Sequence, residues 1–389
     1  MFAEEIKNNL YDCIIPFWKN LKDDEFGGYY GYMDHELKLD KKAEKGCILN
    51  SRILWFFSNV YIERKDEWAL AYAKQAYEFL KNYCLDKENG GVYWSCTYDG
   101  KPLDTSKHTY NQAFAIYALS SYGRAAKDKE ALDLAMTLFH MIETKCRLDE
   151  GYGEEYTIDF KPGVNDKLSE NNVIADKTMN TLLHILEAYT ELYLATGDAK
   201  VKERLCFVLE EMYGKVYSPQ NRRLEVFFDK DMNSLIDLHS YGHDIEGTWL
   251  IDRAIDALED AELDKRYAPM LEDLVDSVYE RAYKDGVFLP EAENGIPVTN
   301  RVWWVQCEAI VGFYNAYERT GQERYKQAAI DIWNYTKEKL IDKREGGEWF
   351  NEIDKDENIV TKWPIVWVWK CPYHNGRMCL EIIRRVGLV

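Results

Sequence analysis

The chain has 389 residues, of which 46% are hydrophobic, and its 68 acidic residues outnumber 49 basic ones for a formal net charge of −19. The electrostatic field of this negative charge repels phosphate backbones and anionic membrane surfaces, which excludes nucleic acid as a partner and favours a neutral substrate. The sequence contains no continuous apolar run of the roughly 18 residues that a membrane helix needs, so no membrane span is expected.

The first residues, MFAEEIKNNLYDCIIPFW, contain neither a basic segment nor an uninterrupted apolar stretch, so we expect no signal peptide. The nine cysteines are scattered and form no CxxC pair, which is typical of reduced thiols. Both features predict a cytoplasmic protein.

Turns rich in glycine and aromatic residues recur along the chain and reveal an internal repeat. They occupy 23–32, 86–95, 148–156, 221–229, 284–291 and 342–352. With Gly27, Gly90, Gly151, Arg222, Gly286 and Gly346 as markers, the spacings are 63, 61, 71, 64 and 60 residues. A steady period repeated six times indicates a repeat architecture, and each turn suits a short hairpin, although the fourth lacks glycine.

Between the turns, apolar residues recur three and four positions apart, as on the buried face of a helix. The expected helices are 3–21, 42–63, 66–85, 106–125, 128–147, 172–196, 198–214, 241–260, 264–283, 302–320, 322–340 and 371–386. Stop and start residues occur at 197–198 and 320–321. Twelve helices in six pairs predict an all-α fold, an (α/α)6 barrel, as one domain over 1–389. The polar stretch 157–171 is expected to be a loop that covers the site.

If inner and outer helices alternate, the even-numbered helices surround a central site. His108, His184, His243 and His374 lie on or at the start of helices four, six, eight and twelve, Arg52 lies on helix two, and Trp303, Trp304 and Glu308 lie on helix ten. Every inner helix therefore contributes a polar or aromatic side chain to one place.

Two segments stand out, SYGHDIEGTW (240–249) and WKCPYHNGRMCLEI (369–382). His243 and Glu246 are three residues apart and would share a helix face. Pro372 suits the first turn of the last helix, which places His374 near a helix N-terminus that favours negative charge.

Two other chemistries are considered at these residues. His239, His243 and Glu246 would make a plausible metal-ligand set, but the sequence has no HExxH motif, and we expect no metal or cofactor. Glu246, Glu308 and Asp104 are candidate carboxylates for a glycosidase, which needs an acid and a base on either side of the bond. The paired histidines are the rarer feature and favour proton transfer.

These segments, together with NSRILWFFS (50–58), KHTYNQAFAIYALS (107–120), ADKTMNTLLHILEAYTELY (175–193) and RVWWVQCEA (301–309), resemble the N-acylglucosamine 2-epimerase superfamily. The resemblance runs from end to end and is strongest to members that epimerise disaccharides such as cellobiose. It implies an (α/α)6 barrel and metal-free proton transfer without a nicotinamide cofactor.

The resemblance also implies roles for residues. His243 and His374 become the two general acid/bases, Glu246 pairs with His243, and Arg52, Asn180 and His184 donate to the substrate. The candidate substrate contacts are Tyr110, Asn180, Trp303, Trp304, Glu308 and Trp369, with Trp304 preferred over Trp303.

Inversion of C2 in an aldose requires ring opening, removal of the C2 proton, and return of a proton to the other face. Histidine, with an unperturbed pKa of about 6.5, can accept and donate that proton near neutral pH. The expected substrate is a neutral β-1,4-linked disaccharide or oligosaccharide, with cellobiose, lactose and mannobiose all open. The rivals are a mannose-type aldose–ketose isomerase, an epimerase of N-acylated amino sugars, and a carbohydrate-binding protein without catalysis.

Overall fold

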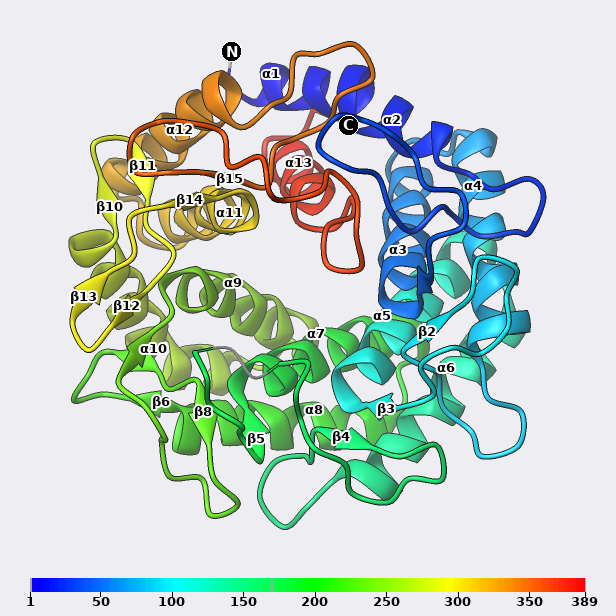
Figure 1. Cartoon of the computed structure of the whole chain (residues 1–389). Helices are drawn as coiled ribbons and strands as arrows, with labels where there is room; N and C mark the ends of the chain where they lie inside the picture. Colours follow the sequence, from blue (N-terminus) through cyan, green and yellow to red (C-terminus); the bar gives the residue numbers. More distant parts are fainter. Residues whose placement is uncertain (1, 169–170, 389) are drawn as a thin grey trace.

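The computed structural model describes residues 2–168 and 171–388, and its helices form two concentric rings (Figure 1). The inner ring comprises α3 (Cys47–Arg64), α5 (Thr109–Ala126), α7 (Met179–Thr196), α9 (Tyr241–Leu258), α11 (Trp303–Thr320) and α13 (His374–Arg385). The outer ring comprises α4 (Glu67–Phe79), α6 (Lys129–Met141), α8 (Ala199–Glu211), α10 (Ala261–Arg281), α12 (Glu323–Lys339) and an N-terminal helix made of α1 (Phe2–Asn9), the π-helical η1 (Leu10–Ile14) and α2 (Ile15–Asn20). The prediction of six helix pairs in an (α/α)6 barrel is confirmed for the described residues.

The apolar pattern explains which helices are inside. The inner helix α3 is buried continuously from Cys47 to Val60. The outer helix α4 buries one face, which includes Ala69, Ala73 and Ala76. A helix that is apolar all round belongs in a core, and one with a single apolar stripe covers it.

The predicted stop and start residues are confirmed. Helix α7 ends at Thr196, and Gly197 follows with a left-handed φ of 64°. Asp198 then caps α8, because its carboxylate accepts hydrogen bonds from the backbone N–H groups of Lys200 and Val201. The outer helices α4, α6 and α8 each continue into a π-helical turn: η2 (Leu80–Cys84), η3 (Ile142–Cys146) and η4 (Met212–Val216).

Each marker of the sequence repeat lies in a hairpin after an outer helix. The paired residues flanking the markers are Lys22–Tyr29, Leu85–Val92, Arg147–Tyr152, Tyr217–Leu224, Lys284–Val287 and Ile341–Trp349. The glycine markers have φ values between 64° and 82°. Arg222, the marker without glycine, also has a left-handed φ of 54°, so the same turn forms there at a modest conformational cost.

Two-residue strands lie at one end of the barrel, where some form local hairpins and others connect neighbouring repeats. They are β1 (Lys45–Gly46), β2 (Ser95–Cys96), β3 (Lys107–His108), β4 (Glu155–Tyr156), β5 (Lys177–Thr178), β6 (Tyr217–Ser218), β7 (Arg223–Leu224), β8 (Phe227–Phe228), β9 (Leu238–His239), β10 (Tyr283–Lys284), β11 (Val287–Phe288), β12 (Ala292–Glu293), β13 (Ile296–Pro297), β14 (Arg301–Val302) and β15 (Glu352–Ile353). The strand before an inner helix pairs with a strand from the next repeat, as in β1–β2, β3–β4, β5–β8, β9–β12 and β14–β15.

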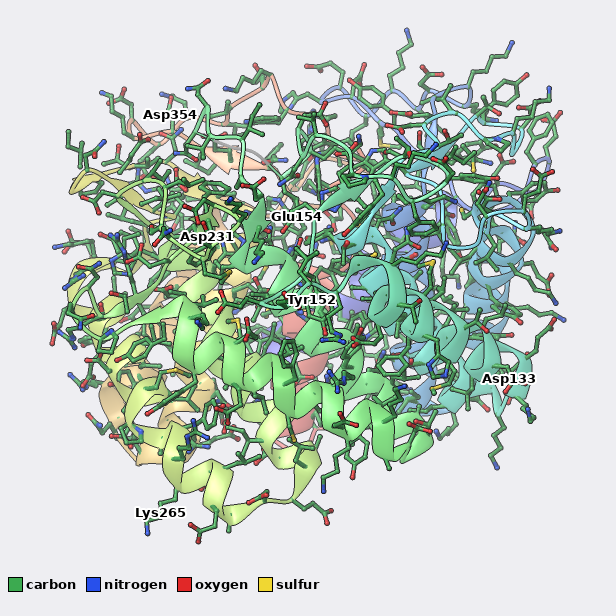
Figure 2. The ribbon with its side chains drawn as sticks, turned by 90° about the horizontal axis from the view of Figure 1, so that it is seen from below. Asp133, Tyr152, Glu154, Asp231, Lys265 and Asp354 are labelled. Carbon is green, nitrogen blue, oxygen red and sulfur yellow. The ribbon has the colours of Figure 1, made fainter. Side chains whose placement is uncertain are left out.

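A bridge between Met33 and Val366 joins the last repeat to the first. These pairings correct three predicted helix starts: α3, α5 and α7 begin later than residues 42, 106 and 172 because β1, β3 and β5 precede them. In side view, Asp354, Asp231 and Glu154 lie toward the end with the strands and long loops, whereas Lys265 and Asp133 lie toward the other end (Figure 2).

The predicted loop 157–171 is irregular as far as residue 168, and residues 169 and 170 lie outside the described residues. Asn165 holds it to the barrel through a 3.1 Å hydrogen bond between its Oδ1 and Nε2 of His108. No helix in the described part of the chain is long and apolar enough to cross a membrane. All nine cysteines are free thiols.

Candidate active site

Three histidines on three inner helices share one arrangement. Nδ1 of His184 lies 3.0 Å from Oε2 of Glu187, and Nδ1 of His374 lies 2.6 Å from Oε1 of Glu308. Nδ1 of His243 lies 2.7 Å from the Ser240 hydroxyl. The three Nε2 atoms have no hydrogen-bond partner among the described residues. Because one nitrogen of each ring is held, the other has a fixed orientation and is available to a ligand.

Arg377 on α13 links these groups beneath the rings. Its Nη2 donates to Oε1 of Glu246 and, at 2.7 Å, to Oε1 of Glu308. Its Nη1 donates to Oε1 of Glu187 at 2.5 Å and to the Tyr373 hydroxyl. One guanidinium therefore fixes three carboxylates from α7, α9 and α11, and all four side chains are about 1% exposed.

The expected pairing of Glu246 with His243 is wrong. Glu246 contacts Arg377 through one oxygen, and its Oε2 is buried without a partner. The i, i+3 spacing fails here because the Ser240 hydroxyl occupies Nδ1 of His243. Of the two histidines, His243 and His374, only His374 is held by a carboxylate, and that carboxylate belongs to Glu308.

Glu308 was expected to contact substrate, but both of its oxygens are bonded within the protein. Oε1 contacts His374 and Arg377, and Oε2 accepts a 3.0 Å hydrogen bond from Nε1 of Trp249. Glu308 is thus placed to orient His374 and to set the charge of its ring.

Trp304 joins the two histidines of the specific segments. Its ring centroid lies 5.0 Å from that of His243 and 5.3 Å from that of His374. Gly242 permits this approach, since a Cβ there would come within 2.7 Å of the indole. Trp303 is buried and packs edge-on against His374, so Trp304, which is half-buried, is the tryptophan with a free surface.

On the opposite side of the site, Arg52 binds neutral partners only. Its Nη2 donates to the Tyr110 hydroxyl at 2.8 Å and its Nη1 to the Trp369 carbonyl at 3.2 Å. None of the ion pairs in the described residues includes Arg52, so its buried positive charge is not neutralised. The Tyr110 ring lies 4.9 Å from that of His184 and 5.9 Å from that of Trp369, which brings α3, α5, α7 and the segment before α13 together.

Asn180 and His108 lie outside these contacts. Asn180, the second residue of α7, is half-buried, and its Oδ1 is buried without a partner. His108 is fully buried before α5: its Nδ1 accepts from the Tyr110 backbone N–H and its Nε2 bonds Asn165. The expected four converging histidines are therefore three, because His108 anchors the loop at residue 165.

Burial sets the charges of the site. It lowers the pKa of His243 to about 4 and also lowers the pKa values of His184 and His374. It raises the pKa values of Glu246 and Glu308, whereas Arg377 holds the pKa of Glu187 below its usual value despite burial. The histidines are thus neutral at pH 7 and ready to accept a proton.

Since His243 titrates near pH 4, catalytic efficiency (kcat/KM) should stay level through pH 6.5, where an ordinary histidine titrates, and fall only as pH approaches 4. The unfolded chain binds protons on His184, His243 and His374 below about pH 6.5, whereas in the folded chain burial lowers the pKa of each, so stability should also decline from there toward pH 4. Initial rates measured against pH test the prediction for kcat/KM, and denaturant midpoints measured against pH test the prediction for stability. A fall in kcat/KM centred at pH 6.5 would contradict the lowered pKa of His243.

The other chemistries do not fit this geometry. His239 bonds Asp244 at 2.7 Å through Nε2 and Arg281 through Nδ1, so it is not available to a metal with His243. Glu246, Glu308 and His374 lie within 4.8 Å of one another, but the Arg377 guanidinium already bridges the two carboxylates. Arg377 also bonds both carboxylates, and Trp249 bonds Glu308, whereas a glycosidase needs an acid and a base carboxylate that face the glycosidic bond.

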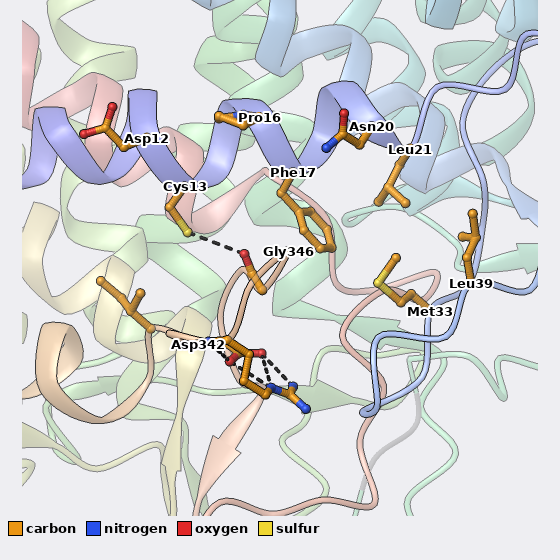
Figure 3. A pocket seen from close by; sticks show the side chains of 13 residues that line it. Asp12, Cys13, Pro16, Phe17, Asn20, Leu21, Met33, Leu39, Asp342 and Gly346 are labelled. Atoms are coloured by element: carbon orange, nitrogen blue, oxygen red, sulfur yellow. Dashed lines mark hydrogen bonds and ion pairs between the residues drawn. The ribbon is translucent and has the colours of Figure 1, made fainter.

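A separate cavity of about 530 Å³ lies on the outside of the barrel, between the N-terminal helix and residues 341–347 (Figure 3). Phe17, Met33 and Leu39 line one side of it, and the Asp342–Arg344 ion pair lines the other. None of the residues of the central site reaches it.

Sequence reasoning missed Glu187, Tyr373, Arg377, Trp249 and Ser240. Two of them carried a usable signal: Glu187 follows His184 by three residues and Arg377 follows His374 by three, so each shares a helix face with its histidine. Trp249 and Ser240 are placed by contacts between helices and within a turn, which spacing alone does not predict.

An (α/α)6 barrel with three oriented histidines, an unpaired arginine and half-buried indoles at one end has the features of an enzyme that acts on a neutral, polar molecule. The chain belongs to the N-acylglucosamine 2-epimerase family, whose sequence profile matches residues 28–374. It is 53% identical over 386 residues to the cellobiose 2-epimerase of Ruminococcus albus, with 99% of each chain covered.

Solved structures agree with this placement. The crystal structure of a sugar epimerase from a ruminal bacterium superposes with a TM-score of 0.98 at 52% identity, covering 99% of both chains. A D-mannose isomerase, at 19% identity, shares the fold with a TM-score of 0.83 over 99% of this chain and 97% of its own.

Proposed function

We propose that this protein inverts C2 of the reducing-end glucose of β-1,4-linked disaccharides and that cellobiose is its substrate. The observation that carries the proposal is the pair of neutral histidines, His243 and His374, whose rings both contact Trp304 and each of which has a free Nε2. The names of the relatives, which are cellobiose 2-epimerases at 46–53% identity, support the choice of substrate.

In the proposed reaction, the open-chain aldose lies with C2 between the two rings. One histidine removes the C2 proton through Nε2, and the electron pair moves through C1 to O1 to give a planar cis-enediolate. The other histidine, neutral in the free enzyme, takes up a proton from water once the negative charge of the enediolate lies beside it, and delivers that proton to the opposite face of C2, while the first histidine returns its proton to water. Glu308 stabilises the imidazolium form of His374 in either direction, because its carboxylate contacts Nδ1.

The negative charge that develops on O1 needs fixed donors. Arg52 supplies an unneutralised guanidinium held by Tyr110 and the Trp369 carbonyl. Neutral His184 donates its Nδ1 hydrogen to Glu187 and therefore presents an Nε2 lone pair, which can accept a hydrogen bond from a substrate hydroxyl. The Asn180 carboxamide is a further candidate contact, since its unpartnered Oδ1 can accept a hydrogen bond from a substrate hydroxyl.

The non-reacting sugar requires an apolar surface outside the reacting position. Trp304 and Trp369 are the half-buried indoles next to the site. We expect Trp369→Ala and Trp304→Ala to raise KM for cellobiose, with a lower kcat where that binding orients the reacting ring. Steady-state kinetics and melting curves test this; a lower melting temperature with unchanged KM in the folded fraction would assign these residues to packing.

The substrate and reaction are tested together by incubation with cellobiose and identification of the product by NMR. The proposal predicts glucosyl-mannose. A ketose as the main product would favour a mannose-type isomerase, and turnover of monosaccharides or N-acylated amino sugars alone would overturn the disaccharide assignment. Cellobiose binding without turnover would leave a carbohydrate-binding protein.

The reaction as proposed uses no metal or cofactor. Dialysis against EDTA should therefore leave epimerisation unchanged, since the two histidines supply the proton transfers. Loss of activity that zinc or manganese restores would instead place an ion at Glu246, Glu308 and His374. We also propose that the reaction takes place in the cytoplasm, because all nine cysteines are free thiols. We propose that residues 1–389 form one domain, because the six-fold repeat runs along the chain.

A further inference from the structure

Three cysteines from separate elements meet at the junction of the first two repeats. Cys47 is the first residue of α3, Cys84 is the last residue of η2, and Cys96 lies on β2. Their sulfur atoms all lie within 4.8 Å of one another, and the three residues are fully buried. No other cysteine, histidine, aspartate or glutamate of the described chain joins this group.

The other repeats show what this position requires for packing. Each of the three cysteines has a counterpart in the following repeats. Cys47 corresponds to the first residue of the next inner helix, Cys84 to the last residue of the next π-helical turn, and Cys96 to the strand residue that pairs with the lysine before the inner helix. In the next two repeats they are Thr109, Cys146 and Tyr156, then Met179, Val216 and Phe228. In these two repeats, three side chains of different types fill the corresponding positions. Of the three junctions compared, only the one between the first two repeats carries a thiol at all three positions.

A buried positive charge lies beside the three thiols. Lys45, which is fully buried, pairs with Asp23 at 2.6 Å and lies opposite Cys96 in the pairing of β1 with β2. Its ammonium group offsets part of the negative charge that coordinating sulfurs bring into the interior.

We propose that Cys47, Cys84 and Cys96 form a three-sulfur binding site for a single Cu(I) ion. Three soft donors without a fourth ligand suit this ion, whereas structural zinc is almost always four-coordinate. Each thiol that coordinates releases its proton, so affinity rises with pH. The ion joins α3, η2 and β2 and adds a cross-link between neighbouring repeats at the strand end of the barrel.

The site is tested on the whole reduced protein under anaerobic conditions. Cu(I) is partitioned between the protein and a chromogenic Cu(I) chelator, and bound copper is counted per chain. We expect about one equivalent bound by the wild type, a higher melting temperature with copper, and copper X-ray absorption that shows sulfur neighbours only. Cys47→Ser, Cys84→Ser and Cys96→Ser should each lose the bound equivalent.

Cys146→Ser is the matched control, because Cys146 is buried and holds the position of Cys84 in the next repeat. It should retain copper, and all variants should keep their circular dichroism and epimerase activity. Absence of bound copper in the wild type, equal loss in Cys146→Ser and Cys96→Ser, or one retained equivalent of Zn(II) in place of Cu(I) would each overturn the proposal. Because the readout is metal content, failure here leaves the proposed epimerase reaction untouched.

Discussion

His374→Ala and His243→Ala should each lower kcat for cellobiose by at least about a hundredfold, the lower scale for loss of a general acid or base. Each ring has its Nδ1 held, by Glu308 and by Ser240, and presents Nε2 beside Trp304. Alanine removes the proton acceptor without breaking a buried ion network, since both rings are neutral before they react. Steady-state kinetics on folded variants measures the effect.

His140→Ala is the matched control, because His140 is exposed on the outer helix α6. Its kcat should equal that of the wild type. Near-normal turnover in His374→Ala or His243→Ala would remove that residue from the mechanism. The kcat of Glu308→Gln should lie between that of the wild type and that of His374→Ala. The amide keeps a hydrogen bond to His374 but lacks the negative charge of the carboxylate.

Arg377→Met should destabilise the fold by about 3–5 kcal/mol, the scale for removing one partner of a buried ion pair. Three carboxylates from different inner helices depend on this one guanidinium, and all are buried. Without it, Glu187, Glu246 and Glu308 face one another with uncompensated charge. Denaturant unfolding near neutral pH measures the loss in the free energy of unfolding.

Two comparisons separate charge from packing. Arg324→Ala removes an ion pair with Asp276 that is more than a third exposed, and its effect should be far smaller. Adding Glu246→Gln to Arg377→Met should recover part of the stability, because it neutralises one of the unpaired carboxylates. Equal losses in the single and double variants would show that Arg377 acts by packing alone.

The fold was predictable because its repeat depends on short-range sequence features, namely the turn residues and the spacing of apolar residues. Five of the six turns need a left-handed residue that glycine supplies, and each interval carries two helical apolar patterns. The start of α7 was predicted seven residues early, at 172, because a two-residue strand such as β5 has no periodicity of its own and forms only by pairing with β8.

The candidate site was predictable to the level of which helix carries which group. His184, His243, His374 and Arg52 converge as expected, but the partners of these groups were not all foreseen. Glu246 and Glu308 differ in role because Arg377 and Trp249 reach them from other helices, and such contacts depend on the packing of the ring rather than on spacing along one helix.

Hydrogen exchange at C2 tests the two-histidine reaction most directly. Cellobiose is incubated in deuterated water with the wild type, His243→Ala or His374→Ala, and C2 is followed by proton NMR. The wild type should place deuterium at C2 of both epimers. Each variant should lose net epimerisation and retain slow exchange in one epimer only, a different epimer for each histidine. A product that retains its C2 proton in the wild type, or exchange of both epimers in either variant, would contradict proton transfer by two histidines.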